Sequence, residues 1–146
     1  MSKIEIRDNE GIVLHTVRGT DLVNANLAGV DLAGANLAGV HLRYANLTGA
    51  NLTGANLRYA NLMCAYLEGA HLTRADLRHT HLWYADLREA NLEMANLENA
   101  NLGYVNLKEA NLGYANLGYA NLGYANLRGA NLKGTILEGL RLGGNA

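Results

Sequence analysis

Two histidines and one cysteine are the side chains in this sequence best suited to metal binding or nucleophilic chemistry. His79 and His81 lie two residues apart, and Cys64 is the only cysteine. A tetrahedral zinc site needs four ligands, and no second cysteine helps to complete one, so we expect surface histidines, no metal and no other cofactor. A Cys/His nucleophile pair needs a concave pocket to hold its substrate, and none is expected in this chain. We therefore predict no catalytic residues and no enzyme activity.

The elements that position these side chains follow from a strict five-residue repeat. Leucine occupies every fifth position from Leu22 to Leu142, 25 times without a substitution. Alanine stands two residues before the leucine in 18 repeats, and asparagine stands between them in 15. Two variable spacer residues follow each leucine, and glycine takes the second spacer ten times. A repeat this regular indicates one small structural unit copied along the chain.

The spacing of the apolar residues decides between helix and strand. Apolar side chains recur at steps of two and three residues, whereas one face of a helix needs steps of three and four. A strand places residues two apart on one face, so Ala-Asn-Leu is predicted to be extended, with alanine and leucine inward and asparagine outward. The three-residue step to the next alanine would send it to the wrong side of a straight strand, so the chain must turn a corner there.

Repeated corners make the chain coil. Glycine at the two spacer positions suits a corner that needs a positive φ. Short sides joined by such corners predict a β-solenoid whose coils stack about 4.8 Å apart. The outward asparagines are expected to form hydrogen-bonded ladders along the rod and are assigned to structure.

The string Ala-Asn-Leu-Gly-Tyr-Ala-Asn-Leu-Gly-Tyr at 110–119 resembles the pentapeptide-repeat family, and the resemblance spans residues 20–144. It implies an all-β fold, a right-handed quadrilateral β-helix with four pentads in each coil. Leucine and the small residue two before it would then fill the interior. At about 4.8 Å per coil, about six coils make a straight, uniform rod of roughly 30 Å.

Both ends of the chain depart from the repeat. Residues 3–7 alternate in polarity, residues 8–11 have turn chemistry, and residues 12–14 form a second apolar run. We therefore predict that residues 1–19 form a β-hairpin that caps the N-terminal coil, because an uncovered coil exposes a pairing edge. The solenoid follows as residues 20–144, and residues 145–146 form a tail. Ile136 and Leu140 at atypical sites predict a homodimer through the C-terminal end of the solenoid.

With twenty residues per coil, residues twenty apart become neighbours on one face. One face then carries a column of Tyr44, Cys64, Tyr84, Tyr104 and Tyr124, with Met63 and Trp83 beside it. Exposed tyrosine and tryptophan are enriched at binding hot spots. Stacked rings also stabilise sheets without any ligand, and both interpretations stay open.

Departures from the consensus cluster between residues 63 and 86, where His79 and His81 lie. Such a cluster fits a partner-binding patch, and it equally fits drift at exposed sites of a solenoid. The candidate partner-binding residues are Trp83, Tyr84, Tyr104, Tyr124, Tyr44, His79 and His81.

Charge composition limits the classes of partner. The chain has 12 Lys plus Arg against 13 Asp plus Glu, a formal net charge of −1. This balance favours neither nucleic acid nor an anionic membrane, and no stretch approaches the ~20 apolar residues of a membrane span. The N-terminal residues lack the apolar run of a signal peptide, so we expect a cytoplasmic protein.

The family resemblance raises one further function, because some pentapeptide-repeat proteins protect DNA gyrase by imitating duplex DNA. A duplex carries one negative charge per ~1.7 Å, so a rod of this length would need on the order of 18. Residues 20–146 hold ten acidic and nine basic residues, so the imitation is poor. We expect a non-catalytic scaffold or interaction protein whose outer faces contact an unknown protein partner. Gyrase or topoisomerase protection and a structural spacer without a specific ligand are the alternatives.

Overall fold

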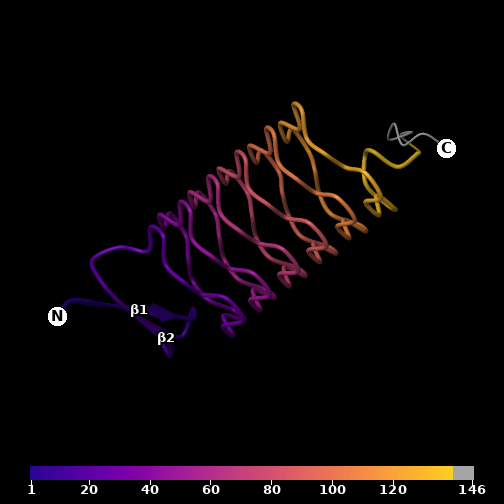
Figure 1. Ribbon diagram of the computed structural model, residues 1–146. Helices are drawn as coiled ribbons and strands as arrows, with labels where there is room; N and C mark the ends of the chain where they lie inside the picture. The colour runs from indigo at the N-terminus through magenta and orange to yellow at the C-terminus, as the bar shows by residue number, and fades with distance from the viewer. Residues whose placement is uncertain (140–146) are drawn as a thin grey trace.

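The computed structural model describes residues 1–139, whose backbone forms a rod of stacked coils with the N-terminus at one end and the last described residues at the other (Figure 1). Residues twenty positions apart pair in parallel, from Asn26 with Asn46 to Asn111 with Asn131. Twenty residues are four pentads, so each coil has four short sides. Each of these parallel bridges forms at the outward residue that precedes a leucine. The sides are therefore single bridges stacked in register rather than long strands.

An antiparallel hairpin precedes the coils (Figure 1). Strand β1 covers Lys3–Arg7 and strand β2 covers Val13–Arg18, with a register shift next to Arg7. The Arg7 carbonyl accepts the Asn36 N–H at 2.8 Å, which ties the end of β1 to the first coil. Two paired strands therefore lie where the sequence predicts a hairpin.

The core is a continuous column of leucine and small residues. Every leucine of the repeat from Leu27 to Leu117 is at most 1% exposed, and the residue two before each leucine packs beside it. Burial of each leucine contributes about 1.5–3 kcal/mol before the entropy of ordering is subtracted. Thr80 takes one of the small sites, and its buried hydroxyl donates to the Leu77 carbonyl at 2.7 Å. The predicted inward positions of leucine and alanine are confirmed.

Each corner depends on a residue in the left-handed region. Every second spacer from Asn24 to Gly139 has a positive φ, and fifteen of these residues are not glycine. The first spacers do not have a positive φ. The expectation that glycine provides a positive φ at both spacer positions is therefore wrong for the first spacer. The first spacer is instead held by its N–H, which donates to the Asn or Asp oxygen two residues earlier, as from Thr48 to Asn46 at 3.0 Å.

Asparagine amides form the predicted ladders along the rod. Asn131 Nδ2 donates to Asn111 Oδ1 at 2.9 Å, and Asn111 Nδ2 donates to Asn91 Oδ1 at 3.2 Å. Each of these amides donates towards the N-terminal end, so the first member of a column needs only to accept. Asp31 fills that position and accepts from Asn51 Nδ2 at 3.0 Å.

Candidate functional site

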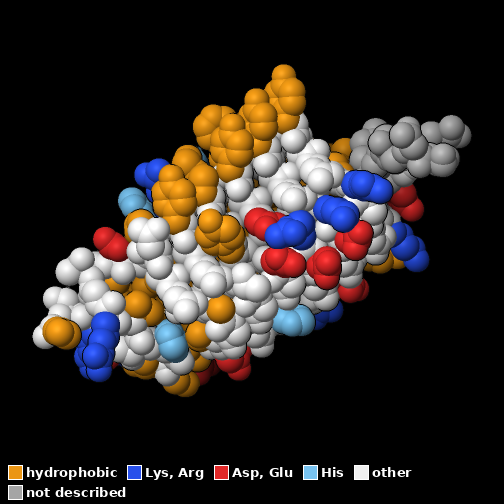
Figure 2. Space-filling model, in the orientation of Figure 1, with side chains coloured by type: hydrophobic (Ala, Val, Ile, Leu, Met, Phe, Trp, Pro, Cys, Tyr) orange, Lys and Arg blue, Asp and Glu red, His pale blue; other side chains and the backbone are white. Residues whose placement is uncertain are grey.

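Three tyrosines stack along one corner of the rod. The Tyr84 and Tyr104 ring centroids lie 4.8 Å apart, as do those of Tyr104 and Tyr124, with interplanar angles of 15° and 11°. The Trp83 ring packs beside this stack, 5.4 Å from Tyr84 and 6.1 Å from Tyr104. We call Trp83, Tyr84, Tyr104 and Tyr124 the aromatic ridge. Figure 2 shows hydrophobic side chains gathered along the upper long edge of the rod.

The aromatic ridge is exposed although its rings contact one another. Its exposed fractions run from 39% at Trp83 to 83% at Tyr124. Stacking occupies the ring faces inside the column, so the ring edges and the outer face of Tyr124 remain for a partner. The ridge therefore offers large apolar contact area at spacings that the backbone fixes.

A glycine one coil later makes room for the indole. A Cβ on Gly103 would overlap the indole nitrogen of Trp83, and Gly103 is itself buried. At Gly123, in the same place on the following coil, a Cβ would meet only Asn121 Oδ1, at 3.2 Å. Gly103 thus allows the indole to lie against the two tyrosines.

Tyr44 occupies the same corner but does not join the stack. It precedes Tyr84 by forty residues, or two coils, and Cys64 takes the place between them. The Arg43 guanidinium lies over the Tyr44 ring, 5.5 Å from its centroid. A stack needs an aromatic ring in every coil, and the cysteine interrupts it.

The two histidines occupy different places on the rod. His79 stacks on Tyr59 at another corner, with ring centroids 4.8 Å apart and planes 5° apart. His81 is exposed on the side that leads to Trp83. Within residues 1–139, no three His, Cys, Asp or Glu side chains are grouped to hold a metal ion. The same residues include no helix long and apolar enough to cross a membrane.

Ion pairs neutralise acidic residues on the neighbouring faces. Arg88 pairs with Asp86 at 2.7 Å and with Glu68 at 2.9 Å, and Arg78 pairs with Asp76 at 2.6 Å. The hydrogen bonds from Arg88 hold the pKa of Asp86 below its usual range, and Arg78 lowers the pKa of Asp76 in the same way. Figure 2 shows acidic and basic side chains mixed below the hydrophobic edge. This face therefore carries no strip of uniform charge.

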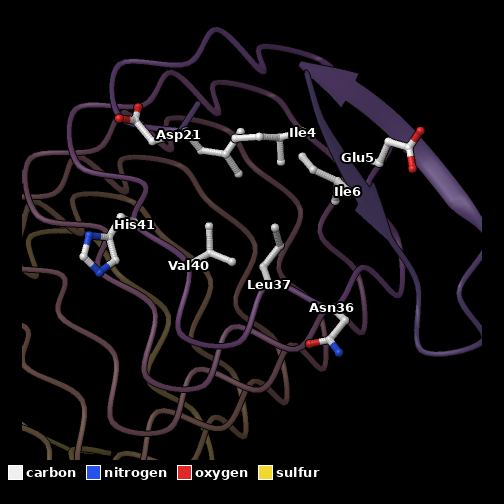
Figure 3. Close-up of a pocket in the computed structure, with 9 residues that line it drawn as sticks. Ile4, Glu5, Ile6, Asp21, Asn36, Leu37, Val40 and His41 are labelled. Atoms are coloured by element: carbon white, nitrogen blue, oxygen red, sulfur yellow. The ribbon is translucent and has the colours of Figure 1, made fainter. Parts of the chain in front are cut away.

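A pocket lies between the hairpin and the first coil (Figure 3). Its volume is about 170 Å³. The expectation that the chain has no concave pocket is therefore wrong, because β1 is tied to the coil near Arg7 and does not fill the space above Leu37 and Val40. Apolar residues in the hairpin are the only sequence signal for it. The lining residues are Ile4, Glu5, Ile6, Asp21, Leu22, Asn36, Leu37, Val40 and His41.

Comparison with known families identifies the coil. A family model described as pentapeptide repeats matches residues 20–58, 60–93, 90–123 and 110–144, as 8 copies. The chain belongs to the pentapeptide-repeat family. No curated protein matches it.

Solved pentapeptide-repeat structures support the same fold. Rfr23 from the cyanobacterium Cyanothece 51142 is 36% identical over 78% of this chain and 88% of its own, with a TM-score of 0.65. A trypsin-treated form of QnrB1, a plasmid-mediated fluoroquinolone resistance protein, is 25% identical with a TM-score of 0.56. That match covers 77% of this chain but only 60% of QnrB1. The predicted class is confirmed: this pentapeptide-repeat chain is a right-handed β-helix.

Proposed function

We propose that the protein is a non-catalytic interaction module that binds a protein partner through the aromatic ridge. The observation that carries this proposal is the run of exposed, stacked tyrosines with a tryptophan beside them. Tyrosine and tryptophan dominate the hot spots of protein interfaces because they bury a large area with few rotatable bonds. Members of this repeat family are in general structural or interaction proteins, which agrees with such a role.

The backbone under the ridge adds support. Tyr84, Tyr104 and Tyr124 adopt φ values of 55° to 60°, where a residue with a Cβ costs roughly 1–2 kcal/mol more than glycine. A neighbouring corner uses Gly29, Gly49 and other glycines at this position. The fifteen strained residues occur on all four corners, but the ridge corner carries six of them, more than any other, which fits a binding role.

In this proposal the coils act as a rigid support. The hairpin of β1 and β2 caps a rod of about six coils, and the buried Ile6 of β1 packs onto the core. Each repeat contacts its neighbours in fixed register, so the ridge is held in its bound arrangement before the partner arrives. Such preorganisation lowers the entropy cost of binding.

Affinity capture from the source lysate tests the proposal. The ridge variant combines Trp83→Thr with Tyr84→Gly, Tyr104→Gly and Tyr124→Gly. The fold already uses threonine as a first spacer and glycine as a second spacer at another corner, as at Thr48 and Gly49. A matched control carries Tyr59→Gly, Tyr114→Gly and Tyr119→Gly at other corners. We expect wild type and control to capture the same protein and the ridge variant to capture about tenfold less of it.

Equal capture by all three proteins would contradict the ridge proposal. If wild type captures no protein saturably, the structural spacer without a specific ligand becomes the better description. Circular dichroism of each variant, with the wild-type β spectrum as reference, shows whether the fold is retained.

Protection of DNA gyrase or topoisomerase is the second candidate, and the similarity to QnrB1 favours it. The near balance of ten acidic and nine basic residues in 20–146 opposes imitation of a duplex, as do the ion pairs of Arg78 and Arg88. We expect the protein to leave quinolone inhibition of gyrase supercoiling unchanged. Restored supercoiling in the presence of the drug would favour this candidate instead.

A further inference from the structure

We infer that the pocket between the hairpin and the first coil binds a small organic cation, an ammonium ion that carries one ring or one branched alkyl group. The pocket is separate from the aromatic ridge and lies at the N-terminal end of the rod. Two elements form it: β1 contributes Ile4 and Ile6, and the first coil with the start of the second contributes Leu22, Leu37 and Val40. In Figure 3 the Ile4, Ile6, Leu37 and Val40 side chains surround one common space.

The size and the walls of the pocket select the apolar part of the ligand. The volume of about 170 Å³ is close to that of an apolar cavity that accommodates one benzene molecule, about 150 Å³. The wall is apolar: Ile4 and Val40 are half-buried, and Ile6, Leu22 and Leu37 are buried. Water against these apolar side chains has few hydrogen-bond partners, so a single ring or branched chain gains free energy by displacing it.

Charge at the rim selects the polar part of the ligand. Asp21 and His41 lie together on one side of the pocket (Figure 3). The Asp21 carboxylate accepts the Val23 N–H at 3.1 Å, and among residues 1–139 no cation pairs with it. Glu5 also lines the pocket, but Lys3 and Arg7 pair with it. An ammonium group one carbon from the buried ring is therefore attracted to Asp21, whereas a carboxylate at the same place is repelled.

Occupation of the pocket would also hold the hairpin onto the coil. The backbone link that ties β1 to the coil is at its end, where the Arg7 carbonyl accepts the Asn36 N–H and Asp8 bridges to Ala35. A ligand between Ile4 and Val40 adds a second contact between the two elements. Since it would contact both elements only when the hairpin is closed, its binding opposes hairpin opening.

Methyl and amide NMR of the full chain tests this inference with three probes of similar shape: benzylamine, benzyl alcohol and benzoate. We expect benzylamine to shift the Ile4, Ile6 and Val40 methyl signals saturably at about millimolar concentration. Benzyl alcohol should bind about two- to fivefold more weakly and benzoate more weakly still, because the Asp21 charge is exposed to water. At ten times the dissociation constant, hydrogen-exchange protection of the β1 and β2 amides should rise about tenfold.

Three variants separate the parts of the pocket. Val40→Phe fills the space and should abolish binding, whereas Val30→Phe, a half-buried valine at an equivalent site that does not line the pocket, should bind as wild type does. Asp21→Asn should remove the preference for benzylamine over benzyl alcohol and leave benzyl alcohol binding unchanged. If Val40→Phe does not fold, Ile4→Phe fills the same space from the hairpin side.

The inference is overturned by an absence of saturable shifts, by equal affinity for benzylamine and benzoate, or by binding that survives in the filled variants. It is also overturned if Asp21→Asn keeps the full preference for the amine. None of these results bears on the aromatic ridge, whose residues do not line the pocket.

Discussion

Tyrosines at the corners of this rod adopt a backbone conformation that glycine adopts without strain. Tyr119 has a φ of 56° and is 88% exposed, whereas Tyr104 has a φ of 55° and stacks on a ring at each side. Ring contacts therefore offset the backbone strain at Tyr104. At Tyr119 most of the side chain faces solvent, and few contacts offset the same strain. Substitutions at these two residues separate the two effects.

We predict opposite effects for Tyr119→Gly and Tyr104→Gly. The first removes about 1–2 kcal/mol of strain. Glycine also raises the entropy of the unfolded chain, which costs about 0.4–1 kcal/mol of stability. The free energy of unfolding should therefore rise by up to about 1.6 kcal/mol. The second also loses three ring pairs, with Tyr84, Tyr124 and Trp83. At about 0.5–1.5 kcal/mol for each pair, it should destabilise the protein by about 2 kcal/mol. Urea unfolding followed by circular dichroism measures both. Shifts of the same sign would show that stacking does not offset the strain.

The carboxylate of Asp86 makes stability depend on pH. Hydrogen bonds from Arg88 lower the pKa of Asp86 in the folded chain, so the folded state favours the ionised form. This contribution is present above the ordinary carboxyl pKa of about 4 and is lost as the pH falls through the folded value. Asp86→Asn should therefore be less stable than wild type at pH 7, with the difference shrinking below about pH 4.

Asp86→Asn is a mild change for the backbone, since asparagine is the usual residue at this position and keeps an oxygen for the Arg88 N–H. Thermal unfolding across the pH range measures the difference, which should also shrink in high salt because the Arg88 ion pair is partly exposed. A difference that is independent of pH would exclude the charge as its cause.

At the scale of the element, one corner is shaped by a contact between coils. The Trp83 indole lies in the space that Gly103 leaves open one coil later, and this places it against Tyr84 and Tyr104. An added methyl group at Gly103 must displace the indole, whereas the same group at Gly123 would meet only Asn121 Oδ1, at 3.2 Å. The arrangement of the ridge thus depends on a glycine that is not itself part of it.

Gly103→Ala should displace Trp83 into solvent and destabilise the protein by about 1–3 kcal/mol. Because Trp83 is the only tryptophan of the chain, its fluorescence emission reports the change directly and should move to longer wavelength. Gly123→Ala is the control and should leave the emission unchanged. An unchanged spectrum in Gly103→Ala would show that the indole does not rely on this space.

At the scale of the whole molecule, the two proposed contact regions use different parts of one rod. The ridge follows a corner through successive coils, and the pocket lies at the N-terminal end under the hairpin. A rod whose coils pair in register holds both regions at fixed separation, so occupation of one need not alter the other. The C-terminal end raises the separate question of assembly.

The homodimer predicted through the C-terminal end remains a prediction. Ile136 replaces the usual asparagine and is 72% exposed, and Leu140 and residues 145–146 lie outside the described residues. An exposed apolar side chain at the last coil favours contact with a second copy. Light scattering coupled to size exclusion should give about twice the 15.7 kDa chain mass for wild type.

Ile136→Asn restores the usual residue and should yield the monomer, whereas His41→Asn at the other end should leave the mass unchanged. A monomeric wild type at high concentration would rule out this dimer.

The sequence by itself determined the repeat, the inward leucine and alanine, the outward asparagine ladders and the corners, because a strict period of five fixes side-chain direction at every residue. The resemblance to the pentapeptide-repeat family supplied the number of sides in each coil, which is four. The column of Tyr84, Tyr104 and Tyr124 then followed from counting twenty residues. Local spacing is enough to predict these features, since every pentad repeats the same backbone geometry.

Only the tertiary structure determined how the non-repeating side chains pack. It placed the Trp83 indole in the space beside Gly103, one coil later. It also left a pocket where β1 meets the first coil. These outcomes depend on contacts with residues twenty or more positions away and on how a non-repeating hairpin sits against a repeating rod. No local pattern encodes that packing.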